Sequence, residues 1–210
     1  MGNTDHQGKK AAKEQASLHS TLLEQLRHGD EQAWQDFAYV FGPLIESWCV
    51  GAGLPRDSVP DIRQEVLRSV SKNIASFRRD RPGDSFRGWL WQVTRNKIRD
   101  FWRAERCRPQ AVGGTQFHQE LGNLADPISA NSAPTSFHEE RKLVGRALEL
   151  VRGQVAGPTF EAFRLLVLEG LTAADVAQQL GMSTGAVYVA KSRVLKRLRE
   201  VFGELWEEPE

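Results

Sequence analysis

The chain has 210 residues, of which 40% are hydrophobic and 26% are charged, a composition that excludes a wholly disordered protein and predicts a buried core in one domain or two small ones. The formal net charge of +1 does not by itself indicate a nucleic-acid-binding protein, so such a function depends on how the charges are distributed. Cys49 and Cys107 are too few and too far apart for a zinc site or a disulfide framework, and they indicate a reduced, cytoplasmic protein.

The N-terminal part of the chain is expected to be a solvated tail followed by helices. Residues 1–17 contain three lysines but no apolar run, so they resemble neither a signal peptide nor a membrane anchor. Asp30 is expected to cap a helix that carries Trp34. A second helix, from Ser58 to Phe77, is expected to begin with Ser58 as its cap and Pro60 in its first turn. Its apolar side chains fall on one face: Val59, Ile62, Val66, Val70, Ile74 and Phe77.

A third helix is expected from about Phe86 to Arg106, after a loop in which Asp84 or Ser85 can act as the cap. From Phe86 to Arg108 the chain has seven basic residues and two acidic ones, a net charge of +5. Four arginines form a stripe along this helix: Arg95, Arg99, Arg103 and Arg106. Residues 18–108 therefore predict an all-helical bundle that contains one strongly basic helix.

Trp91 and Trp102 lie beside this arginine stripe. Phosphates are bound by cations and unstacked bases by flat aromatic surfaces, so the arrangement suits a single nucleic-acid strand. The alternative is that the tryptophans belong to the core and that the arginines are their solvated neighbours. We favour the core for Trp89, Leu90 and Val93, and both interpretations stay open for Trp91 and Trp102.

Residues 109–136 are rich in Gly, Ala, Ser, Asn and Pro and contain no Lys or Arg, so we interpret them as a flexible linker. A second helical domain is expected at residues 137–206. Gly157 and Pro158 separate its first helix from one that ends at Gly170. The predicted fold is therefore all-α, with two small helical domains joined by a flexible linker.

The second domain contains a short helix with Thr172 as its expected cap, a turn at Gly181, and a new helix from Thr184 to about Val201. A helix, a glycine-bearing turn and a second helix are typical of a helix-turn-helix. From Thr184 to Glu200 the chain has five basic residues and one acidic residue, a net charge of +4. The apolar face of this last helix is expected to pack inward: Val187, Ala190, Val194, Leu198 and Val201.

The opposite face of this helix suits entry into a DNA groove, which favours small residues at the entering end and hydrogen-bond donors beyond it. An isolated basic helix is as well explained by a solvated surface. The preceding helix and turn favour DNA binding here. The candidate contacts are Thr184, Gly185, Tyr188, Lys191, Ser192, Arg193 and Lys196.

These segments resemble the extracytoplasmic-function (ECF) sigma factors, which are promoter-reading subunits of bacterial RNA polymerase. The resemblance covers almost everything from Leu18 to Phe202. In the first domain it rests on Asp61-Ile62-Arg63-Gln64-Glu65-Val66, Trp89-Leu90, Asn96 and Asp100, and in the second on Lys191-Ser192-Arg193. Both blocks in this order, on either side of a linker, make the resemblance specific.

The resemblance implies core RNA polymerase and promoter DNA as partners and leaves open whether an anti-sigma factor also binds. It implies that one helix face docks on core polymerase: Asp61, Gln64, Glu65, Arg68 and Lys72. It implies that the loop over residues 76–85 holds a flipped base of the minus-ten element, with contacts to that strand and to the edge of the duplex from Arg78, Arg79, Trp91, Arg95, Asn96, Arg99, Arg103 and Arg106. The helix from Thr184 would read the minus-thirty-five element.

Two other classes of function compete with this interpretation. An autonomous helix-turn-helix regulator would leave the basic aromatic helix and the face from Asp61 to Lys72 unexplained. An enzyme is disfavoured because the five histidines are scattered and no HExxH motif, phosphate loop or nucleophile elbow occurs. We therefore expect no catalytic residues, no cofactor, no metal site and no insertion into a membrane.

Overall fold

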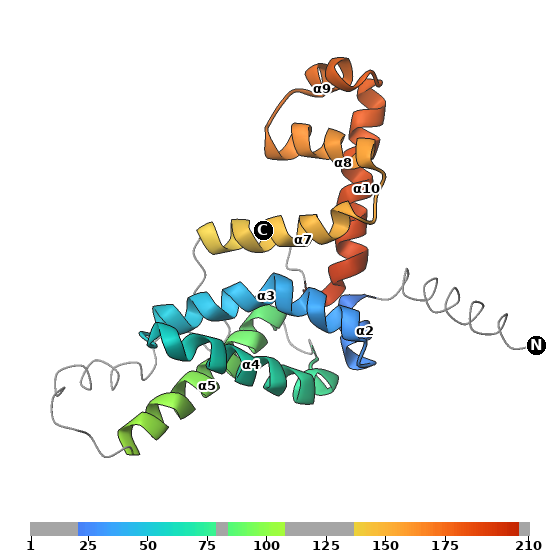
Figure 1. Ribbon diagram of the computed structural model, residues 1–210. Coiled ribbons are helices and arrows are strands. Elements are labelled where there is room, and N and C mark those ends of the chain that lie inside the picture. The colour runs from blue at the N-terminus through green and yellow to red at the C-terminus, as the bar shows by residue number, and fades with distance from the viewer. Residues whose placement is uncertain (1–20, 79–83, 108–136, 206–210) are drawn as a thin grey trace, which may run out of the picture. The chain divides into compact units, whose positions relative to one another are not determined.

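The computed structural model describes residues 21–78, 84–107 and 137–205 (Figure 1). Every regular element within these ranges is a helix, and the predicted all-α fold is confirmed. The chain divides into two compact units, one of residues 41–140 and the other of residues 1–40 together with 141–210. Residues 21–40 thus group with the C-terminal unit, whereas the sequence predicts a first domain that begins at residue 18.

The unit of residues 41–140 is formed mainly by a pair of helices, α4 and α5, which pack against each other (Figure 1). The apolar face predicted for residues 58–77 is buried from Val59 to Phe77, although the α-helix itself ends at Asn73 and continues as the 3-10 turn η2. Burial of each such side chain contributes about 1.5 to 3 kcal/mol. The elements of this unit are the C-terminal half of α3 (Glu31–Gly51), η1 (Arg56–Ser58), α4 (Val59–Asn73), η2 (Ile74–Ser76) and α5 (Phe86–Cys107).

Aromatic rings fix the start of α5 against the rest of this unit. Phe86 is fully buried and lies edge-on to Phe41 and to Phe77, with ring centroids 5.4 Å apart in both pairs. Edge-to-face pairs contribute about 0.5 to 1.5 kcal/mol beyond the burial of their area. Leu90, one turn further along α5, is also fully buried, as predicted. The first turns of α5 are therefore held rigidly in the core.

The structure tests three of the predicted helix caps in the first half of the chain. Asp30 accepts a hydrogen bond from the backbone N–H of Ala33 at 2.9 Å, and Ser85 accepts one from Gly88 at 2.9 Å, so both are caps. The prediction for Ser58 is wrong. Ser58 is the last residue of η1 and has a helical backbone, and its hydroxyl makes no capping hydrogen bond within the described ranges. The 3-10 turn starts α4 instead, with Pro60 in its first turn.

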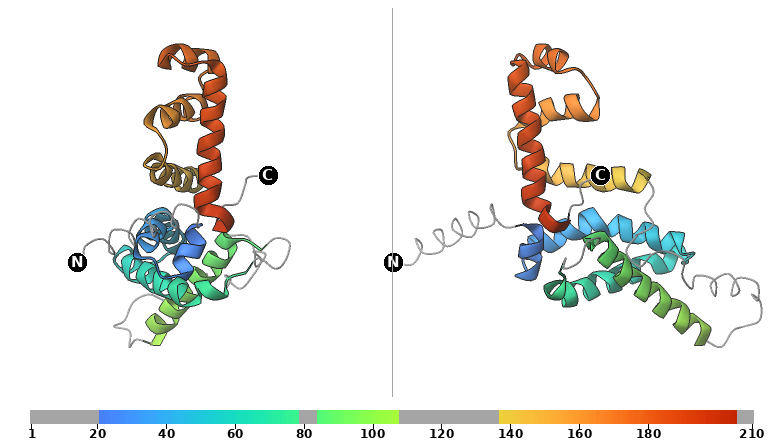
Figure 2. Two further views of the ribbon diagram at one scale, coloured as in Figure 1. Left: turned by 90° about the vertical axis from the view of Figure 1, so that its right-hand side faces the viewer. Right: turned by 180° about the vertical axis from the view of Figure 1, so that it is seen from behind.

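In the second unit, α8 and α9 pack against the long helix α10 (Figure 1, Figure 2). α8 begins at Gly157 with a proline in its first turn, as predicted, and continues into a π-helical segment that ends before Gly170. Gly170 has a φ of +74°, a conformation that favours glycine. The elements described here are α2 (Leu22–Arg27), α7 (Phe137–Arg152), α8 (Gly157–Phe163), η3 (Arg164–Leu168), α9 (Ala173–Leu180), α10 (Thr184–Phe202) and η4 (Gly203–Leu205).

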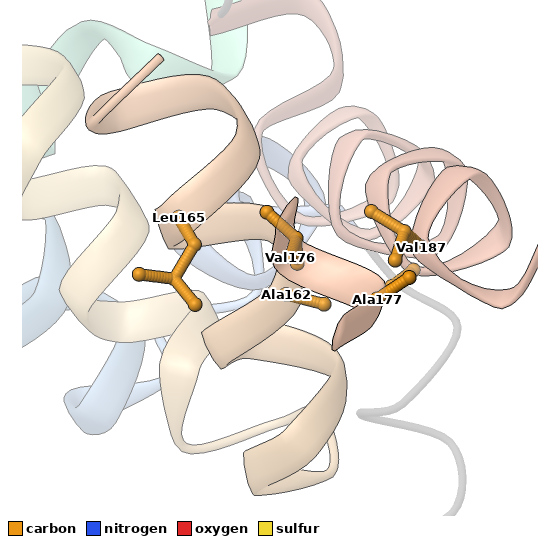
Figure 3. Packing of buried hydrophobic residues seen from close by; sticks show 6 residues of the cluster. Ala162, Leu165, Val176, Ala177 and Val187 are labelled. Carbon is orange, nitrogen blue, oxygen red and sulfur yellow. The ribbon is translucent and has the colours of Figure 1, made fainter. Parts of the chain in front are cut away.

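A compact cluster of small and branched side chains joins α8, η3, α9 and α10 (Figure 3). Ala162 and Val176 are fully buried in it, and Val187 brings in the first turn of α10. The alanines let the helices approach closely, since they project only a methyl group. The start of α10 is therefore held firmly against α9, with its opposite face left to solvent.

Candidate nucleic-acid interface

The turn between α9 and α10 has the local geometry of a helix-turn-helix. The Thr172 hydroxyl caps α9 by accepting a hydrogen bond from Asp175 N–H at 3.2 Å. Gly181 ends α9 in the left-handed conformation, with φ +64° and ψ +34°. Ser183 then caps α10 by accepting a hydrogen bond from Ala186 N–H at 3.1 Å. The predicted motif is thus present, with Thr172 and Gly181 in their expected roles.

The predicted contact residues of α10 all lie on its exposed surface, namely Thr184, Gly185, Tyr188, Lys191, Ser192, Arg193 and Lys196. Glu200 approaches Lys196 at 3.7 Å and Arg197 at 3.3 Å, so acidic charge is confined to the C-terminal part of the helix. Lys191 and Arg193 make no ion pair within the described part of the chain. The N-terminal half of the exposed face is therefore the part best suited to phosphates and base edges.

Val189 lies on this same exposed face and was not among the predicted contacts. Its side chain is 48% exposed, although valine is among the residues most often buried. The helical spacing of the sequence already predicts this exposure, because Val189 falls opposite the buried stripe of Val187, Ala190 and Val194. The pattern of small residues and hydrogen-bond donors does not select Val189, because its side chain is branched and has no donor.

A second candidate surface is a hollow of about 350 Å³ at the start of α5. The Trp89 ring packs against Phe77, with centroids 5.3 Å apart, and against Phe86, at 5.6 Å. The Arg78 guanidinium donates hydrogen bonds to the carbonyls of Ala75 at 2.7 Å and Phe77 at 2.8 Å, which hold it at the rim. The lining consists of Phe77, Arg78, Asp84, Ser85, Gly88, Trp89 and Gln92. Six of these residues were not among the predicted contacts, namely Phe77, Asp84, Ser85, Gly88, Trp89 and Gln92.

The basic stripe of α5 begins near this hollow and continues along the helix. Arg99 and Arg103 are exposed, Arg95 is half-buried, and Asn96 is exposed beside them. Arg103 pairs with Asp100 at 3.3 Å, a surface contact that contributes little to stability. Of the other predicted contacts, Arg79 and the side chain of Arg106 lie outside the described residues.

The tryptophans of α5 differ in their surroundings. Trp91 is half-buried and lies edge-on to the buried ring of Trp48, with centroids 5.3 Å apart. Trp102 is half-buried beside Phe101, with centroids 5.2 Å apart. Trp89, assigned to the core from the sequence, is only half-buried and lines the hollow instead. The ring closest to a base-sized opening is therefore Trp89.

The face of α4 opposite its buried stripe carries the predicted polymerase contacts. Asp61, Gln64, Arg68 and Lys72 are exposed and Glu65 is half-buried. Glu65 pairs with Arg68 at 2.5 Å and approaches Lys97 of α5 at 3.8 Å. The five residues thus form one solvent-facing strip of mixed charge, as the sequence predicted.

Comparison with known proteins identifies the family. The family described as Sigma-70 region 2 matches residues 41–107, and Sigma-70, region 4, matches residues 158–198. The ECF RNA polymerase sigma factor SigD of Mycobacterium tuberculosis is 30% identical over 179 residues, which cover 82% of this chain and 78% of SigD. The chain belongs to the ECF sigma factors. This sigma factor is also 29% identical to ShbA of Streptomyces griseus, over 89% of this chain and 96% of ShbA.

A solved structure of CnrH in complex with the cytosolic domain of CnrY is 22% identical to this sigma factor, with a TM-score of 0.34, and covers 84% of this chain and 92% of that one. Sigma factors of this family are non-enzymatic and direct RNA polymerase to promoters, which decides against both the autonomous regulator and the enzyme. Their partners are core RNA polymerase and DNA. No helix in the described ranges is long and apolar enough to cross a membrane.

Proposed function

We propose that this sigma factor divides promoter recognition between two surfaces, each suited to a different form of DNA. The exposed face of α10 reads the minus-thirty-five element as an intact duplex. The hollow beside Trp89 and the basic stripe of α5 hold the displaced strand of the minus-ten element. The observation that carries this division is the hollow. It is an aromatic recess with a fixed guanidinium at its rim, which suits a base that has left the stack and does not suit a base that is still paired in the duplex.

The free energy gained by binding a flipped base can offset the free energy needed to open the duplex. Flipping a base costs a few kcal/mol of stacking and pairing. Stacking on an aromatic side chain returns about 1 to 3 kcal/mol per base, and the basic stripe adds phosphate contacts. Capture by Trp89 and Arg95 therefore offsets the cost of opening and shifts the promoter toward the melted state.

The remaining surfaces complete the proposal. The strip from Asp61 to Lys72 docks on core polymerase, because it lies on a helix separate from both basic ones. The two DNA-binding surfaces act in separate domains, joined by a tether at residues 109–136 that sets the reach between the two DNA elements. The protein acts in the cytoplasm. The binding of an anti-sigma factor to these surfaces stays a prediction.

A template with a preopened bubble at the minus-ten element tests the division, because it supplies the unstacked strand directly. We expect Trp89→Ala and Trp91→Ala to slow open-complex formation on duplex DNA and to recover on the bubble. Arg193→Ala should lose binding at the upstream element of duplex promoters and should not be rescued in this way. Arg56→Ala, an exposed arginine on η1, is the matched control for loss of charge and should behave as wild type on both templates.

The pattern of rescue decides the outcome. Equal rescue of the Trp89 and Arg193 variants, or rescue of neither, would show that the two helices are assigned to the wrong steps. If Trp91→Ala is rescued and Trp89→Ala is not, base capture belongs to the Trp91 side of α5 and the hollow has no part in it.

A further inference from the structure

Val189 is an exposed aliphatic side chain on a helix face that is otherwise polar, small or basic. It lies one turn after Gly185 and one turn before Arg193, with Ser192 between them on the same face. The neighbouring Tyr188 is 58% exposed, but its hydroxyl can hydrogen-bond to water. Val189 has no such group. Its exposure therefore leaves an apolar surface without a partner at the centre of the face that reads DNA.

Gly185 leaves open space next to Val189, and the fold of the chain does not require a glycine there. Gly185 lies inside α10 and does not have a positive φ. A Cβ atom built on it would meet only the Ser183 hydroxyl, at 3.8 Å, which is ordinary van der Waals contact. Glycine inside a helix is also less favourable than alanine. The missing side chain thus costs helix stability and makes room only for something outside the chain.

The charges around this site identify the class of occupant. Lys191, Arg193 and Lys196 are all exposed on the same helix, and no acidic residue precedes Glu200 in it. Such a rim favours a polyanion over an apolar protein segment. The exposed apolar group that DNA offers in its major groove is the methyl group of thymine, and aliphatic side chains contact it there.

We propose that Val189, in the space left by Gly185, recognises the methyl group of a thymine in the upstream promoter element. The inference rests on the proposed duplex-reading role of α10 and adds a base identity to it. Arg193 and Lys191 hold the helix on the phosphates, and Val189 then excludes water from the thymine methyl. Cytosine lacks this methyl group, so the site distinguishes T·A from C·G without a hydrogen bond.

The test replaces thymine by deoxyuridine, which removes only the methyl group. Holoenzyme first selects duplex sequences from a library randomised over the upstream element, and each enriched thymine is then replaced singly by dU. We expect one position at which dU weakens wild-type binding about fourfold, the value for loss of one buried methyl group. Val189→Ala should bind the T and dU forms equally. Val167→Ala, matched in residue type and 41% exposed in η3, should keep the fourfold difference.

The outcomes separate this inference from the proposed function. If wild-type holoenzyme does not distinguish T from dU at any enriched position, or if Val189→Ala still does, methyl recognition by Val189 is wrong while duplex reading by α10 stands. If holoenzyme initiates transcription but selects no upstream duplex sequence, both the inference and the role of α10 fail together. Val189→Thr keeps one methyl group, and we expect it to retain part of the T preference.

Discussion

Two glycines, Gly181 in the turn before the recognition helix and Gly185 in the first turn of that helix, should respond to substitution by alanine with opposite changes in stability. Gly181 has a φ of +64°, and placing an L-residue in the left-handed region costs about 1 to 2 kcal/mol. No atom lies within 4 Å of a Cβ at this position, so the cost is that of the backbone alone. Gly185 is helical, and alanine there should stabilise the domain by up to about 1 kcal/mol.

The variants Gly181→Ala and Gly185→Ala are compared in the full chain by hydrogen exchange of the α10 amides and by thermal unfolding. For a domain of this size a change of 1 kcal/mol shifts the Tm by about 4 to 8 °C. We expect Gly181→Ala to lower the Tm and Gly185→Ala to raise it. Gly185→Ala should nevertheless weaken duplex promoter binding by the holoenzyme, because its methyl group occupies the space beside Val189.

Gly181→Asn is the control for backbone strain, since asparagine tolerates the left-handed region better than alanine. It should recover part of the stability that Gly181→Ala loses. A loss of stability in both alanine variants would refute the claim that α10 does not need a glycine at position 185. A stabilised Gly185→Ala that binds duplex promoters as well as wild type would show that the missing side chain serves no DNA contact.

Three further outcomes are expected. Reversing or introducing charge at Gln64, Glu65 and Arg68 together should weaken copurification with core polymerase, and unchanged recovery would mean that this face of α4 is not the docking surface. Limited proteolysis should cut first between Gln110 and Ser136, and an earlier cut within α4 would contradict the proposed domains. Burial raises the pKa of the Cys49 thiol to about 12, so in a Cys107→Ser background iodoacetamide at pH 8 should modify the unfolded chain far faster than the native one. An unfolded thiol titrates near its ordinary value of about 8.5, so the contribution of Cys49 to stability is present below that pH and is lost as the pH rises toward 12.

The helical fold and the helix-turn-helix could be predicted from the sequence because both depend on local signals. Apolar spacing located the buried face of α4, and Thr172 and Gly181 marked the ends of α9. Ser58 shows the limit of such signals. A serine before a proline-bearing first turn has the composition of a cap, but the preceding residues form a 3-10 turn that gives Ser58 a helical backbone. Its hydroxyl is then in the wrong place to cap α4.

The roles of the α5 tryptophans could not be separated in the same way, because they depend on contacts between distant parts of the chain. Trp89 and Trp91 are two residues apart on one helix and point in different directions. Trp91 meets the buried ring of Trp48 on α3, whereas Trp89 meets Phe77 directly after η2 and leaves part of its ring facing the hollow. The helical period fixes only the angle between two side chains, so which tryptophan retains an open face depends on where α3 and the segment after η2 pack. A ring that is held on one side by Phe77 and Phe86 loses little conformational entropy when a base stacks on its other side. The partial burial of Trp89 is therefore what suits it to bind a base.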